Sequence, residues 1–362
     1  MDITRYQRQI QLANFGIEAQ QKLSKAKVLV VGAGGLGCPV LMQLTIAGVG
    51  CIGIVDNDEI AYHNLHRQFL YDESTVGKLK TDIARAKLKQ ANSEIDIQVY
   101  NLYLNHKNAI DIIQSYDLII DCCDNFETRY MLNDACVLLN KPFIYGSIDA
   151  YQGQVSFCNV ALQNTRSASY RDLFPQMPQA NEIPNCNEIG TLGVLCSIIG
   201  NYQAAEAIKY ITQVGDLLTN KLLSYDLLTH QQTIYTYEKK NSRPSNLSTR
   251  EAFEAYEYRT TPNSSSTDIE DHSTLESLLQ KENVLLVDVR QFHESPQIEA
   301  EKYIQIPLNE LEMESERLEN IETLIFVCQG GVRSMQAQLW ASEKFPSKKT
   351  YYFSKGIDHI KF

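Results

Sequence analysis

The stretch that most constrains the fold is Val28–Gly37, VLVVGAGGLG, in which an apolar run typical of a buried strand breaks into glycines. Gly32, Gly34 and Gly37 satisfy the pattern G-x-G-x-x-G. Glycines at these positions let the backbone approach phosphate groups, and the N-terminus of the following helix favours negative charge. Asp56 ends the next apolar run, where an acid that binds a ribose is expected. The pattern predicts a nucleotide-binding α/β domain, but it leaves open whether the ligand is NAD, FAD or ATP.

Short apolar runs alternate with helical patterns between residues 26 and 145. Strands are expected at VLVVG, CIGIVD, IDIQVYN, YDLIIDCCDN and PFIYGSI, and helices at 36–47 and 77–91. This alternation predicts a Rossmann-like, doubly wound, mostly parallel sheet. A further strand at QVSFCNV, a helix over Val194–Thr212 and two strands near 221–225 and 233–237 follow, after a stretch rich in Pro, Asn and Gln at 159–187.

A change of composition divides the chain. Residues 239–271 are polar, with NSRPSNLST and TTPNSSSTD, although a helical turn is expected near 251–256. A new α/β pattern then begins with VLLVDVR and TLIFVC as buried strands and SMQAQLWASEKF as a helix. We therefore predict a first domain at 1–240, a linker at 241–270 and a second, smaller α/β domain at 271–362.

Charge and composition exclude several classes of protein. The net charge is −11, and neither part of the chain has the basic excess of a nucleic-acid binder. No apolar run approaches the ~18–20 residues of a membrane span, and the first residues lack the apolar core of a signal peptide. The cysteines number nine, which is odd, and none of them forms a Cys-x-x-Cys pattern. Both features argue against a disulfide framework. We expect a cytoplasmic protein without nucleic-acid or membrane partners.

Polar groups after the second and fourth predicted strands favour ATP over a nicotinamide. HNLHRQ at 63–68 supplies Arg67, and Lys80 follows shortly after. Two cations suit a site that breaks a phosphoanhydride, because negative charge moves onto the leaving pyrophosphate. Asp124 and Asn125 lie at the ligand-binding edge of such a sheet, where a carboxylate can hold Mg²⁺. Taken singly, each residue also fits a solvated surface cation, a turn or a helix cap.

Seven motifs in order resemble the family that activates ubiquitin-like proteins, in its MoeB/ThiF branch. They are RYQRQI, VLVVGAGGLGCP, AGVGCIGIVDND, NLHRQFLY, VGKLK, DCCDNFETRYMLND and KPFIYGS, and the match runs from residue 5 to about 238. The resemblance implies ATP-dependent adenylation of the terminal glycine of a small sulfur-carrier protein ending in Gly-Gly, of MoaD or ThiS type.

The resemblance also implies roles for individual residues. Asp56 would hold the ribose, Arg67 and Lys80 would line the phosphates with Asn64, and Asp124 would bind Mg²⁺. Arg8 resembles the family's arginine finger, which reaches into the site of a partner subunit, so a homodimer is implied. The full set of nucleotide-binding candidates is Gly32, Gly34, Gly35, Gly37, Asp56, Asp58, His63, Asn64, Leu65, His66, Arg67, Lys80, Asp124 and Asn125.

One departure from the family concerns zinc. Many relatives carry two Cys-x-x-Cys pairs that bind a structural zinc ion. The first pair would fall near residues 169–174 and the second near 243–246, and neither stretch contains a cysteine. We predict that no zinc is bound, and SYRDLFPQMP resembles the zinc-free subgroup with a fused C-terminal domain.

Two cysteines are candidates for sulfur chemistry. Cys328 begins CQGGVRS, and the spacing Cys-x₄-Arg to Arg333 resembles the active loop of rhodanese, which carries a persulfide. Loop amides and Arg333 would favour an anionic sulfur there; a catalytically inactive rhodanese fold is the alternative. Cys186, in IPNCNEIGTLG, matches the position of a loop cysteine that bonds the carrier in relatives, but it could also be incidental.

These observations lead to one hypothesis and two rivals. The hypothesis is a sulfurtransferase that adenylates the carrier and then uses Cys328, loaded by a cysteine desulfurase or another donor, to form a thiocarboxylate with Cys186 as resolving thiol. The product would serve molybdenum cofactor or thiamine biosynthesis. The rivals are an NAD-dependent oxidoreductase with an appended domain and a non-catalytic scaffold that binds a ubiquitin-like protein. The HNLHRQ segment argues against the first rival, and the intact cations and Asp124 argue against the second.

Overall fold

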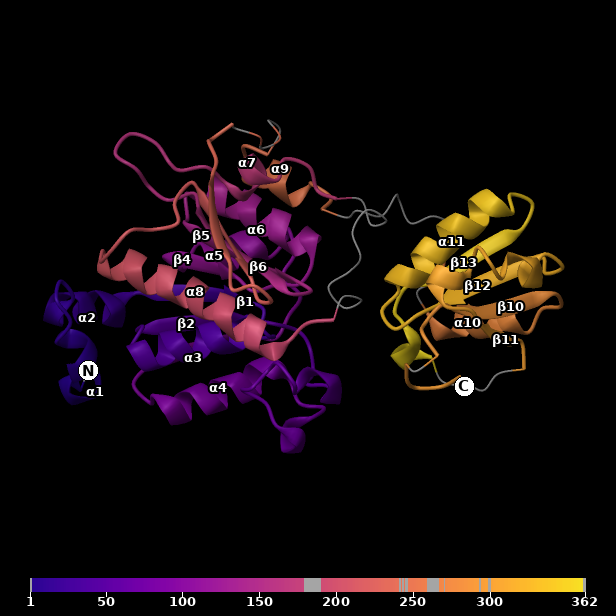
Figure 1. Ribbon diagram of the computed structural model, residues 1–362, viewed down its shortest axis with the longest axis horizontal. Helices are drawn as coiled ribbons and strands as arrows, with labels where there is room; N and C mark the ends of the chain where they lie inside the picture. The colour runs from indigo at the N-terminus through magenta and orange to yellow at the C-terminus, as the bar shows by residue number, and fades with distance from the viewer. Residues whose placement is uncertain are drawn as a thin grey trace. The chain divides into compact units, whose positions relative to one another are not determined.

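The computed structural model of the protein describes residues 2–178, 190–240, 242, 244, 247–258, 267–269, 271–292, 294–298 and 301–360. The chain forms two compact units (Figure 1). The larger unit holds the described residues 2–177 and 190–258, and the smaller unit holds those from 267 onward.

The larger unit is built on an eight-stranded sheet in the order β3-β2-β1-β4-β5-β6-β7-β8. The first five strands are parallel and the last three are antiparallel. Their bounds are β1 Lys27–Val31, β2 Cys51–Val55, β3 Asp96–Tyr100, β4 Leu118–Asp121, β5 Phe143–Asp149, β6 Gln152–Cys158, β7 Lys221–Asp226 and β8 Gln232–Thr236. The predicted Rossmann-like, mostly parallel sheet is confirmed.

Helices cover both faces of this sheet. Helix α3 contacts both α4 and α8, and all three line the same hydrophobic cluster, whereas α5, α6 and α9 line a second cluster on the other face. The helices are α1 Ile3–Ile10, α2 Gly16–Lys25, α3 Gly37–Ala47, α4 Lys80–Ala91, α5 Ala109–Ile113, α6 Phe126–Leu138, α7 Tyr170–Leu173, α8 Gly193–Thr212 and α9 Arg250–Glu254, with short 3₁₀ helices η1 Tyr62–Asn64 and η2 Glu73–Thr75.

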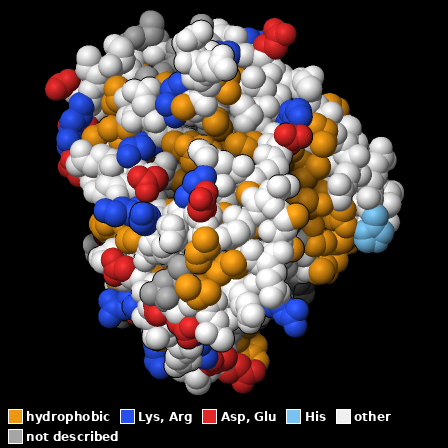
Figure 2. Space-filling model, turned by 90° about the vertical axis from the view of Figure 1, so that its left-hand side faces the viewer, with side chains coloured by type: hydrophobic (Ala, Val, Ile, Leu, Met, Phe, Trp, Pro, Cys, Tyr) orange, Lys and Arg blue, Asp and Glu red, His pale blue; other side chains and the backbone are white. Residues whose placement is uncertain are grey.

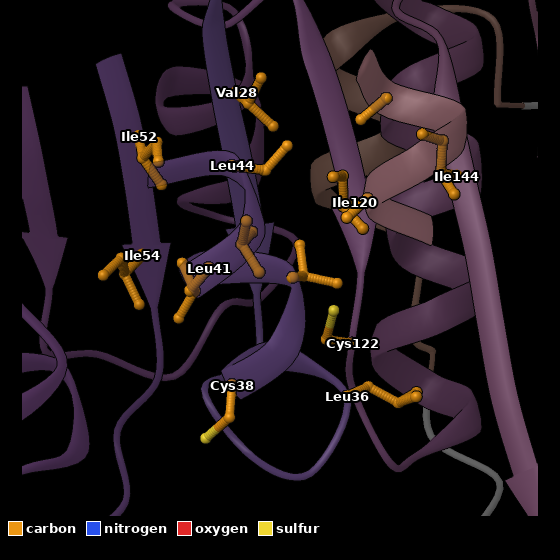
Figure 3. Packing of buried hydrophobic residues seen from close by; sticks show 14 of the residues in the cluster. Val28, Leu36, Cys38, Leu41, Leu44, Ile52, Ile54, Ile120, Cys122 and Ile144 are labelled. Carbon is orange, nitrogen blue, oxygen red and sulfur yellow. The ribbon is translucent and has the colours of Figure 1, made fainter. Parts of the chain in front are cut away.

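The central position of β1 in the sheet explains why residues 28–31 are apolar without interruption. Val28 and Val30 belong to the cluster on the α3 face, and Leu29 and Val31 belong to the cluster on the α6 face. A parallel strand covered by helices on both faces must be apolar at every position. Figure 3 shows part of the first cluster, which contains Val28 of β1 and Leu44 of α3.

The segment expected to be a linker, 241–270, is partly folded onto the larger unit. Helix α9 lies within it, and Phe253 and Tyr258 are buried in the α6-side cluster. The guanidinium of Arg250 donates to both carboxylate oxygens of Asp111, at 2.8 and 2.9 Å. Two buried aromatic rings within a polar stretch account for this packing against the larger unit. Only eight residues then separate Tyr258 from residue 267, where the described part of the smaller unit begins.

The smaller unit has a five-stranded parallel sheet in the order β11-β10-β12-β13-β9 (Figure 1). Hydrophobic clusters lie on both of its faces. The elements are β9 Asp268–Ile269, α10 His272–Leu279, β10 Val284–Asp288, β11 Tyr303–Gln305, η3 Leu308–Glu310, η4 Ser315–Leu318, β12 Thr323–Val327, α11 Val332–Lys344, β13 Lys349–Phe353 and η5 Ile357–His359. The second, smaller α/β fold predicted from the sequence is confirmed.

The described part of the chain contains no helix with the length and apolar character needed to cross a membrane. On the face that Figure 2 shows, basic and acidic side chains are interspersed with separate hydrophobic patches.

Candidate adenylation and sulfur-transfer sites

The glycine loop joins the end of β1 to the start of α3. Gly32 has a φ of 99°, and a Cβ added there would lie 2.5 Å from Cys122 O. A Cβ at Gly37 would lie 2.0 Å from Gly32 O. A side chain at either position would therefore collide with main chain, which explains the first and third glycines of the motif.

Asp56, just after β2, is bonded to this loop. Its Oδ2 accepts the Ala33 N–H at 2.7 Å and its Oδ1 accepts the Asp58 N–H at 2.8 Å. Burial raises the pKa of Asp56, against the opposing effect of Lys80. The carboxylate thus fixes the end of β2 to the glycine loop, at the place where the sequence predicts contact with a ribose.

Lys80, the first residue of α4, is buried and bonded to Asp58. Its Nζ lies 2.6 Å from Asp58 Oδ2, and its side chain is 6% exposed, compared with 60% for Asp58. The Lys80 N–H also donates to Asp58 O at 3.0 Å. The carboxylate of Asp58 therefore holds the ammonium group of Lys80 in a defined position at the edge that carries Asp56.

The HNLHRQ segment forms a tight turn beside the glycine loop. Asn64 is buried, and its Oδ1 accepts the Ala61 N–H at 3.0 Å. Arg67 Nη1 donates to His63 O at 3.0 Å and lies 2.7 Å from His66 Nε2. Burial, followed by the charge of Arg67, lowers the pKa of His66.

Two further contacts place the segment against the loop and the core. A Cβ added at Gly35 would lie 3.5 Å from Arg67 Cδ. Leu65 is half-buried and packs against the cluster on the α3 face. The structure therefore brings Arg67 next to the loop as predicted, whereas Asn64 and Leu65 shape the turn that carries it.

Asp124 and Asn125 follow β4, the neighbour of β1. Asn125 caps α6, and its Oδ1 accepts the Thr128 N–H at 2.8 Å. Asp124 is exposed at the carboxyl end of the strand. The helix cap and the predicted metal-binding carboxylate are thus adjacent residues, of which the first is bonded to α6 and the second is exposed.

A buried ion pair braces the segment that carries Asp124. Arg129 Nε donates to Asp121 Oδ2 at 2.8 Å, and both side chains are buried. Arg129 Nη2 also donates to Cys123 O at 2.9 Å. The sequence analysis did not identify Arg129, although an arginine eight residues after an aspartate at a strand end could have indicated such a brace.

Arg8 lies at the opposite end of α3 from the glycine loop. Gln9 Nε2 donates to Ala47 O at 2.8 Å, and a Cβ at Gly48 would lie 2.7 Å from the Tyr6 ring. Helix α3 has 11 residues, about 16 Å at 1.5 Å per residue. Arg8, exposed on α1, is therefore not brought together with the glycine loop of its own chain.

The second candidate site is the loop between β12 and α11 in the smaller unit. Cys328 is 1% exposed, and its Sγ accepts the N–H of Gly331 at 3.1 Å and the N–H of Ser334 at 3.3 Å. Cys328 Sγ also lies 3.5 Å from Ser334 Oγ. Main-chain amides that converge on a sulfur stabilise its anionic form.

Arg333 is held by a carboxylate outside the loop. Its Nη1 and Nη2 lie 2.6 and 2.8 Å from the two oxygens of Glu294. Burial is the largest single influence on Glu294 and opposes its ionisation, but the bonds from Arg333 and from the Gln291 N–H, together with the charges of Arg333 and Arg290, lower its pKa. The sequence analysis assigned Arg333 to the stabilisation of the anionic sulfur and missed Glu294, which lies 39 residues before Arg333 in the chain.

Comparison with protein families assigns both units. Residues 6–247 match the model of the ThiF family, and residues 271–361 match the rhodanese-like domain. The chain belongs to the ThiF family. The predicted resemblance to a MoeB/ThiF-type enzyme with a fused rhodanese domain is thereby confirmed.

Three relatives have sequence similarity over the ThiF portion. "Adenylyltransferase and sulfurtransferase MOCS3" of Culex quinquefasciatus is 46% identical over 225 residues, 62% of this chain and 50% of the relative. "Sulfur carrier protein adenylyltransferase" of Thermus thermophilus is 43% identical over 63% of this chain and 84% of the relative. "Probable adenylyltransferase/sulfurtransferase MoeZ" of Mycobacterium tuberculosis is 41% identical over 67% and 62%. The match thus spans only half to five-sixths of these relatives.

Among solved structures, MccB of E. coli with MccA-N7isoASN has a TM-score of 0.59 at 23% identity, covering 66% of this chain and 73% of MccB. MccB with ATP has a TM-score of 0.57 and covers 65% and 72%. At this identity the likeness concerns the fold of the ThiF portion.

Two predictions about the ThiF portion concern cysteine and zinc. Cys186 lies outside the described residues, and its role stays a prediction. Around 169–174, where relatives would carry a cysteine pair, Arg171 forms a buried ion pair with Asp134, with Nε 2.8 Å from Oδ1. Asp172 accepts the N–H groups of Lys240 and Ser242 at 2.9 and 3.0 Å. Polar contacts thus join the first region to residues 240 and 242, just before the second, and the expected absence of zinc stays a prediction.

Helix α8 also contributes to the glycine loop, which the sequence analysis missed. A Cβ at Gly35 would lie 2.9 Å from Cys196 Sγ, and a Cβ at Gly193 would lie 2.5 Å from His66 O. The first turn of α8 therefore packs directly against both the glycine loop and the HNLHRQ segment. An isolated Gly and Cys at the start of a predicted helix gave no signal for this contact.

Proposed function

We propose that this chain adenylates the C-terminal glycine of a ubiquitin-like sulfur-carrier protein and then transfers sulfur to it through Cys328. A terminal carboxylate oxygen of the carrier attacks the α-phosphorus of ATP, and pyrophosphate leaves. Adenylation is needed because a carboxylate is a poor electrophile, whereas AMP is a good leaving group.

The observation that carries the first step is the placement of cations around the glycine loop. Arg67 lies against Gly35, and Lys80 is held by Asp58 beside Asp56. Positive groups fixed in advance near the phosphates stabilise the charge that develops on the leaving pyrophosphate. This arrangement supports ATP chemistry over hydride transfer.

The residues at the end of β4 suit a magnesium ion on the phosphates. Asp124 offers an exposed carboxylate, and the Asp121–Arg129 pair fixes the segment that carries it. Mg²⁺ usually binds to one or two carboxylates together with substrate phosphates and water. When bound, the ion would neutralise phosphate charge; Asp124 would hold it, and Asn125 keeps the start of α6 in place.

The second step uses Cys328 as a persulfide. The terminal sulfur of Cys328–S–S⁻ attacks the carrier's acyl carbon, the bond to AMP breaks, and an acyl persulfide forms. The N–H groups of Gly331 and Ser334 support an anionic sulfur at this position. The sulfur comes from a persulfide donor such as a cysteine desulfurase.

Cleavage of the acyl persulfide needs two electrons. In the proposed sequence the Cys186 thiolate attacks Cys328 Sγ, which releases the carrier thiocarboxylate and leaves a Cys186–Cys328 disulfide. An external thiol reductant then regenerates both cysteines. Cys186 is thus proposed as a resolving thiol rather than as a catalyst of adenylation.

A homodimer would complete the adenylation site. Arg8 lies at the far end of α3 from its own glycine loop, which supports a role at the loop of a second copy of the chain. Exposed apolar side chains surround this region: Ile3 is 54%, Leu12 61% and Ile46 44% exposed. Hydrophobic patches also occur on the face shown in Figure 2, which is the left-hand side of the molecule in Figure 1. Apolar surface of this kind marks interaction sites, which supports a partner copy here.

The test of the first step is ATP–pyrophosphate exchange with purified protein, Mg²⁺ and a carrier. A ThiS-type carrier, a MoaD-type carrier, and each lacking its terminal glycine are compared. Exchange that requires one intact carrier establishes adenylation and assigns the pathway to thiamine or molybdenum cofactor synthesis. Lack of exchange with both carriers contradicts the proposal.

The test of the second step is Cys328→Ala. We expect pyrophosphate exchange to stay at the wild-type rate and thiocarboxylate formation to fall by ~10³-fold or more, as for the loss of other enzyme nucleophiles. Carrier mass spectrometry measures the product, and Cys51→Ala is the control. Wild-type thiocarboxylate yield from Cys328→Ala, without free sulfide, would contradict the role of this cysteine.

A further inference from the structure

The side chain of Gln68 is buried beside the glycine loop and has no role in the function proposed above. Gln68 is 3% exposed. Within the part of the chain that the structure describes, its buried Oε1 has no hydrogen-bond partner. A Cβ added at Gly34 would lie 3.5 Å from Gln68 Nε2, so the amide lies against the middle glycine of the motif.

The backbone holds Gln68 in this place. Its N–H donates to Asn64 O at 3.1 Å, and its carbonyl oxygen accepts the Tyr71 N–H at 3.0 Å. The Tyr71 hydroxyl in turn donates to Ala33 O at 2.8 Å. Gln68 and Tyr71 therefore both extend from one turn onto consecutive residues of the loop, which leaves the amide little freedom to move away.

Other buried glutamines of the same unit have partners. Gln20, which is fully buried, donates to Ala47 O at 3.0 Å, and Gln203 donates to Asp121 O at 2.6 Å. More than nine in ten buried polar groups in proteins are bonded, and leaving one unpaired is costly. An unpaired acceptor that persists beside a phosphate-binding loop indicates that its partner arrives with a ligand.

The geometry points to Gln68 as a further substrate-contacting residue, whose amide oxygen accepts a hydrogen bond from an N–H or O–H group of the bound substrate. This inference rests on the proposed adenylation. Two parts of the substrate complex carry such donors. One is the nucleotide, through a ribose hydroxyl or a metal-bound water, and the other is the main-chain N–H of the carrier's terminal glycine.

The test compares Gln68→Met with Gln20→Met. Methionine has nearly the shape of glutamine but no amide, so Gln68→Met removes an unpaired acceptor, whereas Gln20→Met removes a bonded one. We expect the Tm of ligand-free Gln68→Met to rise by about 2–4 °C and that of Gln20→Met to fall. A purely structural role for Gln68 would lower the Tm of both variants.

Binding and exchange measurements then distinguish the two donors. Calorimetry with the ATP analogue AMPCPP and Mg²⁺ reports on the nucleotide, and the KM for a carrier ending in Gly-Gly reports on the carrier. We expect Gln68→Met to weaken one of them about tenfold, and Gln20→Met to change neither by more than twofold. A tenfold loss for AMPCPP identifies the nucleotide as the donor, and a tenfold rise in carrier KM alone identifies the terminal glycine.

Several outcomes would overturn the inference. Unchanged AMPCPP affinity together with unchanged carrier KM in Gln68→Met would exclude a substrate contact, as would a fall in Tm accompanied by equal losses in every assay. Failure of the wild-type protein to bind AMPCPP or to exchange pyrophosphate is a different result, because it removes the proposed adenylation itself. Gln68→Glu, which keeps the length of the side chain, provides a second variant and is expected to weaken AMPCPP binding further through its negative charge.

Discussion

The two candidate sites have the same position in their sheets, but one is assembled from separate segments of the chain and the other from a single loop. Each lies in a loop between the carboxyl end of a parallel strand and the N-terminus of a helix. The nucleotide edge takes its polar groups from separate segments, with Asp56 after β2, Arg67 in a turn and Lys80 at the start of α4. The cysteine loop supplies both donors to Cys328 Sγ from its own next six residues.

The difference also concerns charge. Around Cys328 the cation Arg333 is already paired with Glu294, and the sulfur is held by main-chain amides. At the nucleotide edge Lys80 is paired with Asp58, but Asp124 is exposed, and the hydrogen-bond partners of the Arg67 guanidinium among the described residues are His63 O and His66 Nε2 rather than a carboxylate. A site for a polyanionic triphosphate needs cations that the substrate itself neutralises, whereas a site for one sulfur anion is served by dipoles.

A large effect confined to the nucleotide edge is expected from a change at Lys80. We expect Lys80→Ala to reduce ATP–pyrophosphate exchange by ~10²-fold or more, in line with the loss of other charge-stabilising groups. Persulfide loading of Cys328 from thiosulfate should stay at the wild-type rate. Exchange kinetics measure the first activity. Mass spectrometry measures the second, because a persulfide adds one sulfur atom, about 32 Da, to Cys328.

Lys87 provides the matched control on the same helix. Its Nζ lies 3.0 Å from Asp72 Oδ2, and both side chains are substantially exposed. Exposed ion pairs contribute little, so Lys87→Ala should retain exchange within twofold. Equal losses in the two lysine variants would mean that charge on α4 in general, rather than the position of Lys80, supports the activity.

A smaller effect, on persulfide loading rather than on pyrophosphate exchange, is expected from a change at one of the two glycines of the cysteine loop. Gly331 has a φ of 89°, and a Cβ there would lie 2.0 Å from Ser354 O, whereas a Cβ at Gly330 has no neighbour within 4 Å. Gly331→Ala should slow persulfide loading of Cys328 about tenfold, because strain of 1–3 kcal/mol falls on an N–H that the sulfur needs. Gly330→Ala should load normally.

Both glycine variants should exchange ATP and pyrophosphate at the wild-type rate. Loss of exchange in Gly331→Ala would show that the two sites are coupled more closely than their separate construction suggests. Normal loading in Gly331→Ala would show that the main-chain donors do not stabilise the sulfur anion.

The comparison also explains which features the sequence predicts. Strands such as β1, from Val28 onward, are apolar without interruption because both faces are covered, so the sheet follows from the sequence pattern. The cysteine loop is contiguous, so its motif contains the sulfur and its amide donors. Glu294 and Cys196 reach their sites only through the tertiary fold, and nothing in their immediate sequence marks them.

A further limit of the sequence appears in the expected linker. Its polar composition is genuine, but Phe253 and Tyr258 are enough to bury α9 against the larger unit. Composition averages over a window, whereas packing depends on single large side chains. The orphaned oxygen of Gln68 is likewise a property of the packed structure, since a glutamine in a polar motif looks ordinary until its neighbours are known.

The smallest expected effect concerns the pH dependence of His66. Burial, followed by Arg67 and His63, lowers the pKa of His66 below its usual 6.5. The unfolded chain then binds the proton more readily, so His66 costs the ligand-free protein stability as the pH falls through 6.5. His66→Gln should reduce the drop in Tm between pH 7.5 and 5.5 by about 1 °C, measured against His359→Gln in the second unit. Saturating AMPCPP should reverse the sign, because phosphate charge favours the imidazolium. A pH dependence that is the same with and without the nucleotide would place His66 outside the field of the phosphates, and would weaken the view that Arg67 beside it is kept for the substrate.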